Sequence, residues 1–285
     1  MQNAQFIDVD GVPTRFFEAG TGAPLVLIHG GNMGNSDNVD CAENWGLNWD
    51  GFVKAGFHVL AFDKLGQGFT GNPLRDEDWT MAATVRHAYG FLAALGLTAV
   101  NLVGHSRGGY VVTRLSLEHP EIVKTVTIVD SASTGPGENL KRGPLLADAP
   151  RPLLSSESIA WVTQQFSVND ILSDDWMTIR ETIAGMEKTI SAVKNGEELY
   201  LERHRVQREE TLQWIREGRL TMPTLLIWGF NDPSAIISGG YQLFEIVADH
   251  ASRAELHVFN RAGHYSYREH PADFVKVVTS FVQGA

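Results

Sequence analysis

One serine of this chain lies in a sequence context typical of a nucleophile. Ser106 is the centre of Gly104-His-Ser-Arg-Gly108, a G-x-S-x-G pattern that follows the apolar run Val100–Val103 and precedes a helical stretch. In a tight strand-to-helix turn, small residues two positions before and after the serine avoid a steric clash. The amino end of the following helix also favours negative charge near the serine. A glycine-rich loop with a chance serine is the alternative, and the strand–turn–helix context disfavours it.

A serine hydroxyl needs a general base at neutral pH, and histidine suits that role because its unperturbed pKa is about 6.5. Among the 10 histidines, His264 is the best placed, on a loop just after the last predicted strand. His105 adjoins the serine, but a neighbour in such a turn points away from it. We therefore expect His264 to act as the base and His105 to fill space beside the turn.

The third group should be a carboxylate that fixes the tautomer of the histidine and stabilises its cationic form. Asp232, in Trp228-Gly-Phe-Asn-Asp-Pro233, follows the next-to-last predicted strand. Asp130 follows the strand predicted over Val123–Val129 and is the rival candidate. We favour Asp232, because the chain order serine, aspartate, histidine is the one expected for strand–turn–helix nucleophiles of this type.

Acyl transfer also requires hydrogen-bond donors for an oxyanion. We expect one donor to be the backbone N–H of Arg107, directly after the nucleophile. The second is predicted in the loop Leu27-Ile-His-Gly-Gly-Asn32, where the N–H of Gly31 is the best candidate because glycine lets a substrate approach the backbone. His29 is expected to brace this loop rather than to react.

These side chains are placed by short apolar runs that alternate with longer amphipathic stretches, a pattern typical of a parallel sheet covered by helices. An antiparallel hairpin is expected over residues 5–17, and one helix over Thr80–Leu95, with Thr80 as N-cap and Gly96 as stop. The final helix is expected to begin near Pro271. The predicted buried strands are Pro24–Ile28, His58–Phe62, Val100–Val103, Val123–Val129, Pro223–Trp228 and Glu255–Phe259.

The alternation stops between about residues 135 and 218, where helical patterns follow one another without a strand-like run. Helices are predicted over Ser156–Phe166, Asp174–Val193 and Gly196–Glu217. We therefore predict an α/β core formed by residues 1–134 and 219–285, with residues 135–218 inserted as a helical lid over a cleft. Aromatic residues and methionines in this insertion favour, weakly, a substrate with an apolar or aromatic portion.

Composition narrows the class of protein. The 285 residues carry a formal net charge of −11, and basic residues are not gathered in a stripe, which argues against nucleic acid as a partner. No run approaches the roughly 18 apolar residues of a membrane span, and the N-terminal segment lacks the features of a secretory signal. With a single cysteine, Cys41, no internal disulfide is possible, and we expect a cytoplasmic protein. No metal-ligand spacing or phosphate-binding glycine loop is present, so we expect neither a metal nor another cofactor.

The chain resembles the α/β-hydrolase superfamily over nearly its whole length. The resembling segments are LVLIHGG, FDKLGQGFTG, LVGHSRGG, LLIWGFNDP and RAGHYSYREHP. Within that superfamily it is most similar to the meta-cleavage product hydrolases, which split a carbon–carbon bond of vinylogous 1,5-diketones from aromatic ring degradation. The resemblance implies a Ser-His-Asp triad at Ser106, His264 and Asp232, no cofactor, a helical lid and a homodimer.

The chain departs from that family near the predicted pocket. His105 and Arg107 flank the serine where typical members have Asn and Met, and Tyr265 follows the histidine where many have Trp. The loop between residues 32 and 48 is long and rich in Asn and Asp. A lid arginine holds the substrate carboxylate in the family, and Arg180 is a candidate for it. Asn32, Arg180 and Tyr265 are thus candidate substrate-binding residues.

Other functions remain open at this stage. A carboxylesterase, including one that takes a monoester bearing an acid, needs the same triad and oxyanion donors. Perhydrolases and acyltransferases also retain the serine, whereas dehalogenases and epoxide hydrolases use aspartate there. A different class is a ligand sensor with little turnover, for which the charged run Glu197–Glu210 could recruit a partner, although such a run is more commonly the solvated face of a helix.

Overall fold

The computed structural model describes residues 1–136 and 142–285, with only the backbone given for residues 142 and 195–205. Eight strands of the described residues form one sheet in the order β1-β2-β4-β3-β5-β6-β7-β8. β1 and β2 are antiparallel to their neighbours, and the remaining six strands are parallel to one another. The strands are β1 Gln5–Val9, β2 Val12–Ala19, β3 Pro24–Ile28, β4 His58–Phe62, β5 Val100–His105, β6 Val123–Val129, β7 Thr224–Gly229 and β8 Ala254–Phe259.

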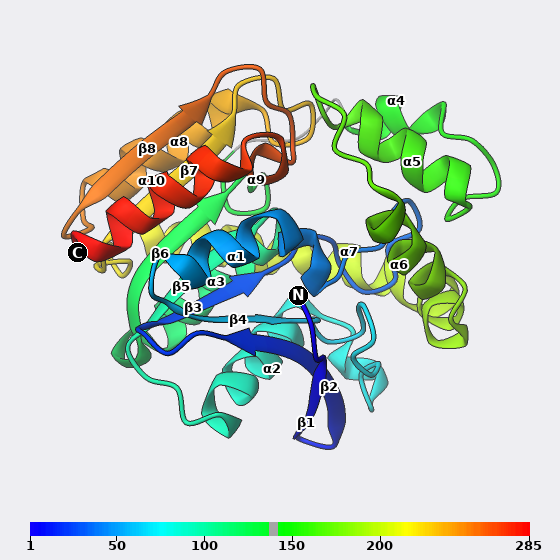
Figure 1. The fold of residues 1–285 in the computed structure, drawn as a ribbon, viewed down its shortest axis with the longest axis horizontal. Helices are drawn as coiled ribbons and strands as arrows, with labels where there is room; N and C mark the ends of the chain where they lie inside the picture. The colour runs from blue at the N-terminus through cyan, green and yellow to red at the C-terminus, as the bar shows by residue number, and fades with distance from the viewer. Residues whose placement is uncertain (137–141) are drawn as a thin grey trace.

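Helices cover both faces of this sheet (Figure 1). The predicted fold class, a mostly parallel sheet flanked by helices, is confirmed, and the predicted hairpin at the sheet edge is β1–β2. The helices outside the insertion are α1 Gly46–Lys54, α2 Met81–Ala94, α3 Arg107–Glu118, α8 Ile237–Ala248, α9 Ser266–Glu269 and α10 Pro271–Gln283, with short 3-10 turns η1 Ala42–Trp45, η2 Asp76–Asp78 and η3 Pro120–Ile122.

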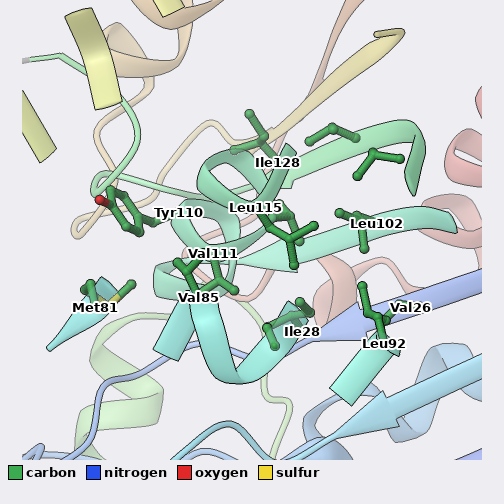
Figure 2. Close-up of a cluster of buried hydrophobic side chains, with 14 of the residues drawn as sticks. Val26, Ile28, Met81, Val85, Leu92, Leu102, Tyr110, Val111, Leu115 and Ile128 are labelled. Carbon is green, nitrogen blue, oxygen red and sulfur yellow. The ribbon is translucent and has the colours of Figure 1, made fainter. Parts of the chain in front are cut away.

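One face of the sheet packs against α2 and α3. Figure 2 shows Val85 and Leu92 of α2 and Leu115 of α3 directed at side chains of the central strands, including Leu102 and Ile128. All five side chains are essentially buried, as a strand covered on both faces requires. The opposite face packs against α1 and α10 in a second apolar cluster. The helices on the two faces hold the strands in place, and the candidate site residues lie in the loops that follow the strand ends.

The helix ends follow the sequence signals. The Thr80 hydroxyl accepts a hydrogen bond from the N–H of Ala83 at 3.0 Å, as an N-cap should, and Gly96 has a φ of +64° just after α2. Pro271 occupies the first turn of α10. These predicted boundaries are confirmed because they depend on local chemistry that the sequence shows directly.

The segment between β6 and β7 contains helices joined by turns and irregular stretches, and no strand, among the residues that the structure describes. It contains α4 Arg142–Ala147, α5 Ser156–Gln165, α6 Asp174–Ala184 and α7 Glu187–Arg216, and Figure 1 shows α4, α5 and α6 gathered at one side of the sheet. The predicted break at residues 194–195 is wrong. α6 ends at Ala184, and α7 then runs through Gly196 without interruption. Residues 137–141 of the predicted lid lie outside the described residues.

No helix among the described residues has both the length and the apolar character to cross a membrane.

His87 couples α2 to β2. Its Nε2 lies 2.9 Å from the Thr14 hydroxyl, which donates to the carbonyl of Val12, so Nε2 carries the proton and donates to Thr14. Burial lowers the pKa of His87 to about 4. In the folded protein this histidine is therefore neutral at neutral pH.

We expect His87 to weaken the fold as the pH falls. The pKa of His87 is lower in the folded chain than in the unfolded chain, so the unfolded state binds the proton more tightly, and stability is lost as the pH falls from about 6.5 towards 4. Over this window wild type should lose about 1.4 kcal/mol per pH unit more than His87→Gln. Urea unfolding at half-unit pH steps measures this difference; parallel curves for the two proteins would contradict it.

Candidate active site

The nucleophile candidate stands on a strained turn between β5 and α3. Ser106 has a φ of 52° and a ψ of −119°, a backbone conformation that non-glycine residues rarely adopt. A Cβ at Gly104 would lie 2.2 Å from the carbonyl oxygen of Gly108, and one at Gly108 would lie 2.3 Å from that of Ile28. Only glycine fits these two positions, which explains the spacing of the sequence pattern.

The structure brings the three predicted catalytic side chains into one hydrogen-bonded line. His264 Nε2 lies 3.1 Å from Ser106 Oγ, and His264 Nδ1 lies 2.7 Å from Asp232 Oδ2. Because the carboxylate can only accept, Nδ1 carries the proton and Nε2 is left to accept from the serine hydroxyl. This is the geometry that a serine nucleophile and its base require.

Asp232 and His264 meet because their two loops are bonded to each other. The N–H of Asn231 donates to the carbonyl of Ala262 at 2.9 Å. The other oxygen of the Asp232 carboxylate, Oδ1, accepts from the N–H groups of Ser234 at 2.6 Å and Ala235 at 2.8 Å. The carboxylate is thus held on both sides, which leaves Oδ2 aimed at the imidazole.

Asp130, the other candidate for the carboxylate that orients His264, has different hydrogen-bond partners. Its Oδ1 accepts from the N–H of Gly229 at 2.7 Å, and its Oδ2 accepts from the hydroxyl of Ser266 at 2.6 Å. Burial raises the pKa of Asp130 well above its usual value, and the neighbouring Asp232 carboxylate adds to the rise. This arrangement joins β6, β7 and the start of α9, so Asp130 braces the loops around the site.

The two histidines expected to be structural make contacts within the chain. His29 Nδ1 lies 2.9 Å from the carbonyl oxygen of Gly30, and His105 Nε2 lies 2.7 Å from that of His264. Burial lowers the pKa of both His29 and His105 well below the ordinary value. Both rings are therefore neutral, and His105 supports the loop that carries His264.

A pocket lies at Ser106 and includes both predicted oxyanion-donor residues, Gly31 and Arg107, in its wall. Asn32 and Tyr265, two of the predicted substrate-binding residues, also line it. The apolar part of the wall is small and comes from Val162, Phe166 and Tyr265. The cavity is lined by Gly31, Asn32, Asn35, Asp37, Asn38, Asp40, His105, Ser106, Arg107, Val162, Phe166, His264 and Tyr265.

Asn35, Asp37, Asn38 and Asp40 were not identified individually from the sequence. The available signal was the density of Asn and Asp in the loop between residues 32 and 48, since polar residues of this kind are rarely buried without a purpose. In the structure Asp37, Asn38 and Asp40 are buried and face the cavity. The site is thus more polar than the aromatic lid residues led us to expect.

Arg180 is not among the residues that line this cavity, in contrast to the prediction that it contacts substrate. Its guanidinium is fully buried behind the wall, where it donates to the carbonyl of Val39 at 3.2 Å, to the Thr163 hydroxyl at 2.8 Å and to the Asn38 side chain. Asn38 in turn donates to the Tyr265 hydroxyl at 2.9 Å. Arg180 therefore reaches the cavity through Asn38, a relation that only side-chain packing could reveal.

Within the described part of the chain, no three His, Cys, Asp or Glu side chains are grouped so that they could hold a metal ion.

The family model of the alpha/beta hydrolase fold matches residues 23–271, and the chain belongs to that family. A Ser-His-Asp triad is typical of this fold, and the chain is a hydrolase.

Individual relatives show which members of the family the chain resembles. The chain is 26% identical to a 2-hydroxy-6-oxo-6-(2'-aminophenyl)hexa-2,4-dienoic acid hydrolase of Metapseudomonas resinovorans, over 98% of this chain and 90% of that protein. It is 27% identical to a 2-hydroxymuconate semialdehyde hydrolase of Pseudomonas sp. (strain CF600), over 96% and 92% of the two chains. A crystal structure of a meta-cleavage product hydrolase, the CumD A129V mutant, superposes with a TM-score of 0.80 at 25% identity, over 99% and 98%. The predicted resemblance to meta-cleavage product hydrolases is confirmed.

The two aspartates should respond differently to loss of charge. Asp232→Asn should lower kcat by about 10⁴-fold, because an amide that can donate no longer fixes the correct tautomer of His264. Asp130→Asn should lower kcat by less than about 10-fold and reduce stability by about 1–3 kcal/mol, because it disturbs a buried hydrogen-bonded brace. Steady-state kinetics and urea unfolding of both variants test this ranking. The reverse order in kcat would identify Asp130 as the carboxylate that orients His264.

Proposed function

We propose that this hydrolase uses Ser106 as nucleophile, His264 as general base and Asp232 as the group that orients the base. Its proposed reaction is hydrolysis of a carbon–carbon bond in a 2-hydroxy-6-oxo-dienoate of the meta-cleavage type. The observation that supports this proposal most directly is the hydrogen-bonded line Asp232–His264–Ser106 beside a pocket. The relatives of the chain are named for such dienoates. The small molecule is the proposed partner, and neither a metal nor another cofactor enters the mechanism.

The proposed reaction passes through an acyl-serine intermediate. The substrate dienol first becomes a ketone, so that the departing carbanion is stabilised. The substrate carbonyl then lies between the N–H groups of Gly31 and Arg107, and the serine oxygen attacks it while Nε2 of His264 takes the hydroxyl proton. The carbon–carbon bond breaks, its electron pair leaves with the dienoate fragment, and that carbon takes up the proton that His264 holds. Water then hydrolyses the acyl-serine and regenerates the enzyme.

We also propose that the helical segment 135–218 acts as a lid on a core formed by residues 1–134 and 219–285. Its α5 places Val162 and Phe166 in the cavity wall. The N–H of His264 donates to the carbonyl of Phe166 at 2.7 Å. The end of α5 is therefore bonded to the loop that carries the proposed base, so a movement of these helices would change the access to Ser106 and the support of His264 together.

The proposed substrate-binding residues fall into two groups. Asn32 and Tyr265 face the cavity and can meet the substrate directly. Arg180 acts on it through Asn38, whose amide joins the guanidinium to the Tyr265 hydroxyl. An apolar or aromatic portion of the substrate would lie against Val162 and Phe166. The homodimer and the cytoplasmic location stay predictions.

Two alternatives share the same site. An ester hydrolase uses an identical triad, and a ligand sensor would bind without rapid turnover; the side chains of residues 197–205 in the charged run proposed for a sensor lie outside what the structure describes. An assay that compares a dienoate with an ester separates the three functions, since each predicts a different pattern of turnover.

We expect wild type to bleach a yellow 6-phenyl-2-hydroxy-6-oxo-hexa-2,4-dienoate much more efficiently than it cleaves a short p-nitrophenyl ester. Ser106→Ala should lower kcat on the dienoate by about 10⁴-fold or more, because the serine acts as a unit with its base. Ser116→Ala is a matched control, since this buried serine donates to the carbonyl of Val112 within α3.

Turnover near wild-type level in Ser106→Ala would refute the proposed nucleophile. Rapid ester cleavage with an untouched dienoate would identify an esterase, and tight binding of the dienoate without turnover would favour the sensor.

A further inference from the structure

The loop that carries the proposed oxyanion donor is held from behind by two side chains of the segment after β4. Lys64 Nζ donates to the carbonyl of Gly31 at 2.8 Å, and Gln67 Nε2 donates to the carbonyl of Gly30 at 3.4 Å. The backbone N–H of Lys64 also donates to His29 Nε2 at 3.1 Å, so the other ring nitrogen, Nδ1, carries the proton and donates to Gly30. Lys64 thus bonds to two residues of the loop, His29 and Gly31.

The contacts to the Gly30 carbonyl fix the direction in which the N–H of Gly31 points. A trans peptide is planar, with its carbonyl oxygen and its N–H on opposite sides. When the carbonyl of Gly30 is bonded to His29 and Gln67, the N–H of Gly31 must point the other way. No hydrogen bond to the Gly31 N–H is present in the described part of the chain, and Gly31 lines the cavity at Ser106. The donor is therefore oriented and available.

Gly31 needs its particular backbone conformation to do this. Its φ is +69°, and a Cβ there would lie 2.4 Å from the Asp40 carboxylate and 2.9 Å from the Gln67 amide. The loop therefore has no side chain of its own to hold it in place at Gly31. The position of the loop depends on the groups that donate hydrogen bonds to its carbonyls, and Lys64 is the charged group among them.

Lys64 also places a titratable charge beside the site. The side chain is essentially buried, at 1% exposure. Burial lowers its pKa to about 7; the Asp40 carboxylate opposes the shift, and the Arg107 guanidinium adds to it. The other titratable rings next to it, His29 and His105, are neutral because burial lowers their pKa values well below the ordinary range. Near neutral pH the charge at this position therefore changes mainly through Lys64.

We propose that Lys64 is a positioning residue for the oxyanion: by holding the Gly31 carbonyl it fixes the position of the loop whose Gly31 N–H meets the substrate, and its ammonium stabilises the negative charge that develops there. The inference rests on the proposed function, because the developing charge arises only if Ser106 attacks a carbonyl. The benefit arises in the transition state and not in the bound substrate, so it belongs to kcat rather than to KM.

A purely structural lysine would give a different result. It would lower stability when removed and leave the pH dependence of kcat unchanged. A positioning lysine changes kcat at constant KM, and its loss of charge produces an alkaline decline. The ammonium is present below its pKa of about 7 and is lost above it, so wild-type kcat should fall as the pH rises from about 7 to 9.

The test is Lys64→Met, which keeps the length of the side chain without its donor or charge, assayed on whichever chromogenic substrate wild type turns over. We expect kcat to fall about 10- to 100-fold with KM within about 2-fold of wild type, and the decline above pH 7 to disappear. Lys188→Met is the matched control. Lys188 is a half-buried lysine whose pKa is also lowered, to about 8, but its charged neighbours are Asp63 and Arg15 instead of the Gly31 loop. It should keep the wild-type kcat and pH profile.

Lys64→Gln keeps a donor but not a charge, and it decides the question if Lys64→Met does not fold. The expected result is a smaller loss of kcat with no decline above pH 7, whereas a wild-type profile would overturn the inference. Wild-type kcat and pH profile in a folded Lys64→Met would overturn it equally. A parallel measurement on Ser106→Ala separates the two proposals: an active Ser106→Ala refutes the proposed function, while an inactive one together with a fully active Lys64→Met refutes only the role of Lys64.

Discussion

The structure depends on one geometric constraint, the tight turn that places Ser106 between β5 and α3. The turn requires a backbone conformation that is unfavourable for serine, so the surrounding packing must enforce it. β5 is hydrogen-bonded on both sides, to β3 and to β6, and α3 is packed on the sheet by Leu115 and its neighbours. Glycines at 104 and 108 remove the atoms that would prevent this close approach.

Everything else in the site is arranged relative to that serine by the ends of parallel strands. Such strands present their carboxyl ends at one edge of a sheet, where ligands bind in open α/β folds. The loop after β3 supplies Gly31, the loop after β7 supplies Asp232, and the loop after β8 supplies His264. Rigid strands position side chains that flexible loops alone would not hold within hydrogen-bonding distance.

A second layer of buried polar groups then supports these loops. Asp130 joins β7 to α9, His105 holds the carbonyl of His264, and Lys64 grips the carbonyl of Gly31. Each is a polar group that would cost free energy if it were buried without a partner. Because their partners are the backbone of the loops, satisfying these groups also orients the proposed catalytic groups.

The sequence by itself determined the strands, the chain order of the candidate catalytic residues and the caps of α2, because the hydrophobic period, apolar runs and turn residues are local properties.

The sequence could not separate Asp232 from Asp130 by contact, since both follow strands and only packing decides which carboxylate meets the imidazole. It misplaced the break between α6 and α7, because Gly196 is tolerated inside a helix whose stability comes from tertiary contacts. It offered Arg180 as a candidate to bind substrate, and the fold buries this guanidinium behind Asn38. Which buried polar side chain meets which backbone group is a long-range outcome, and it exists only once the layers have packed.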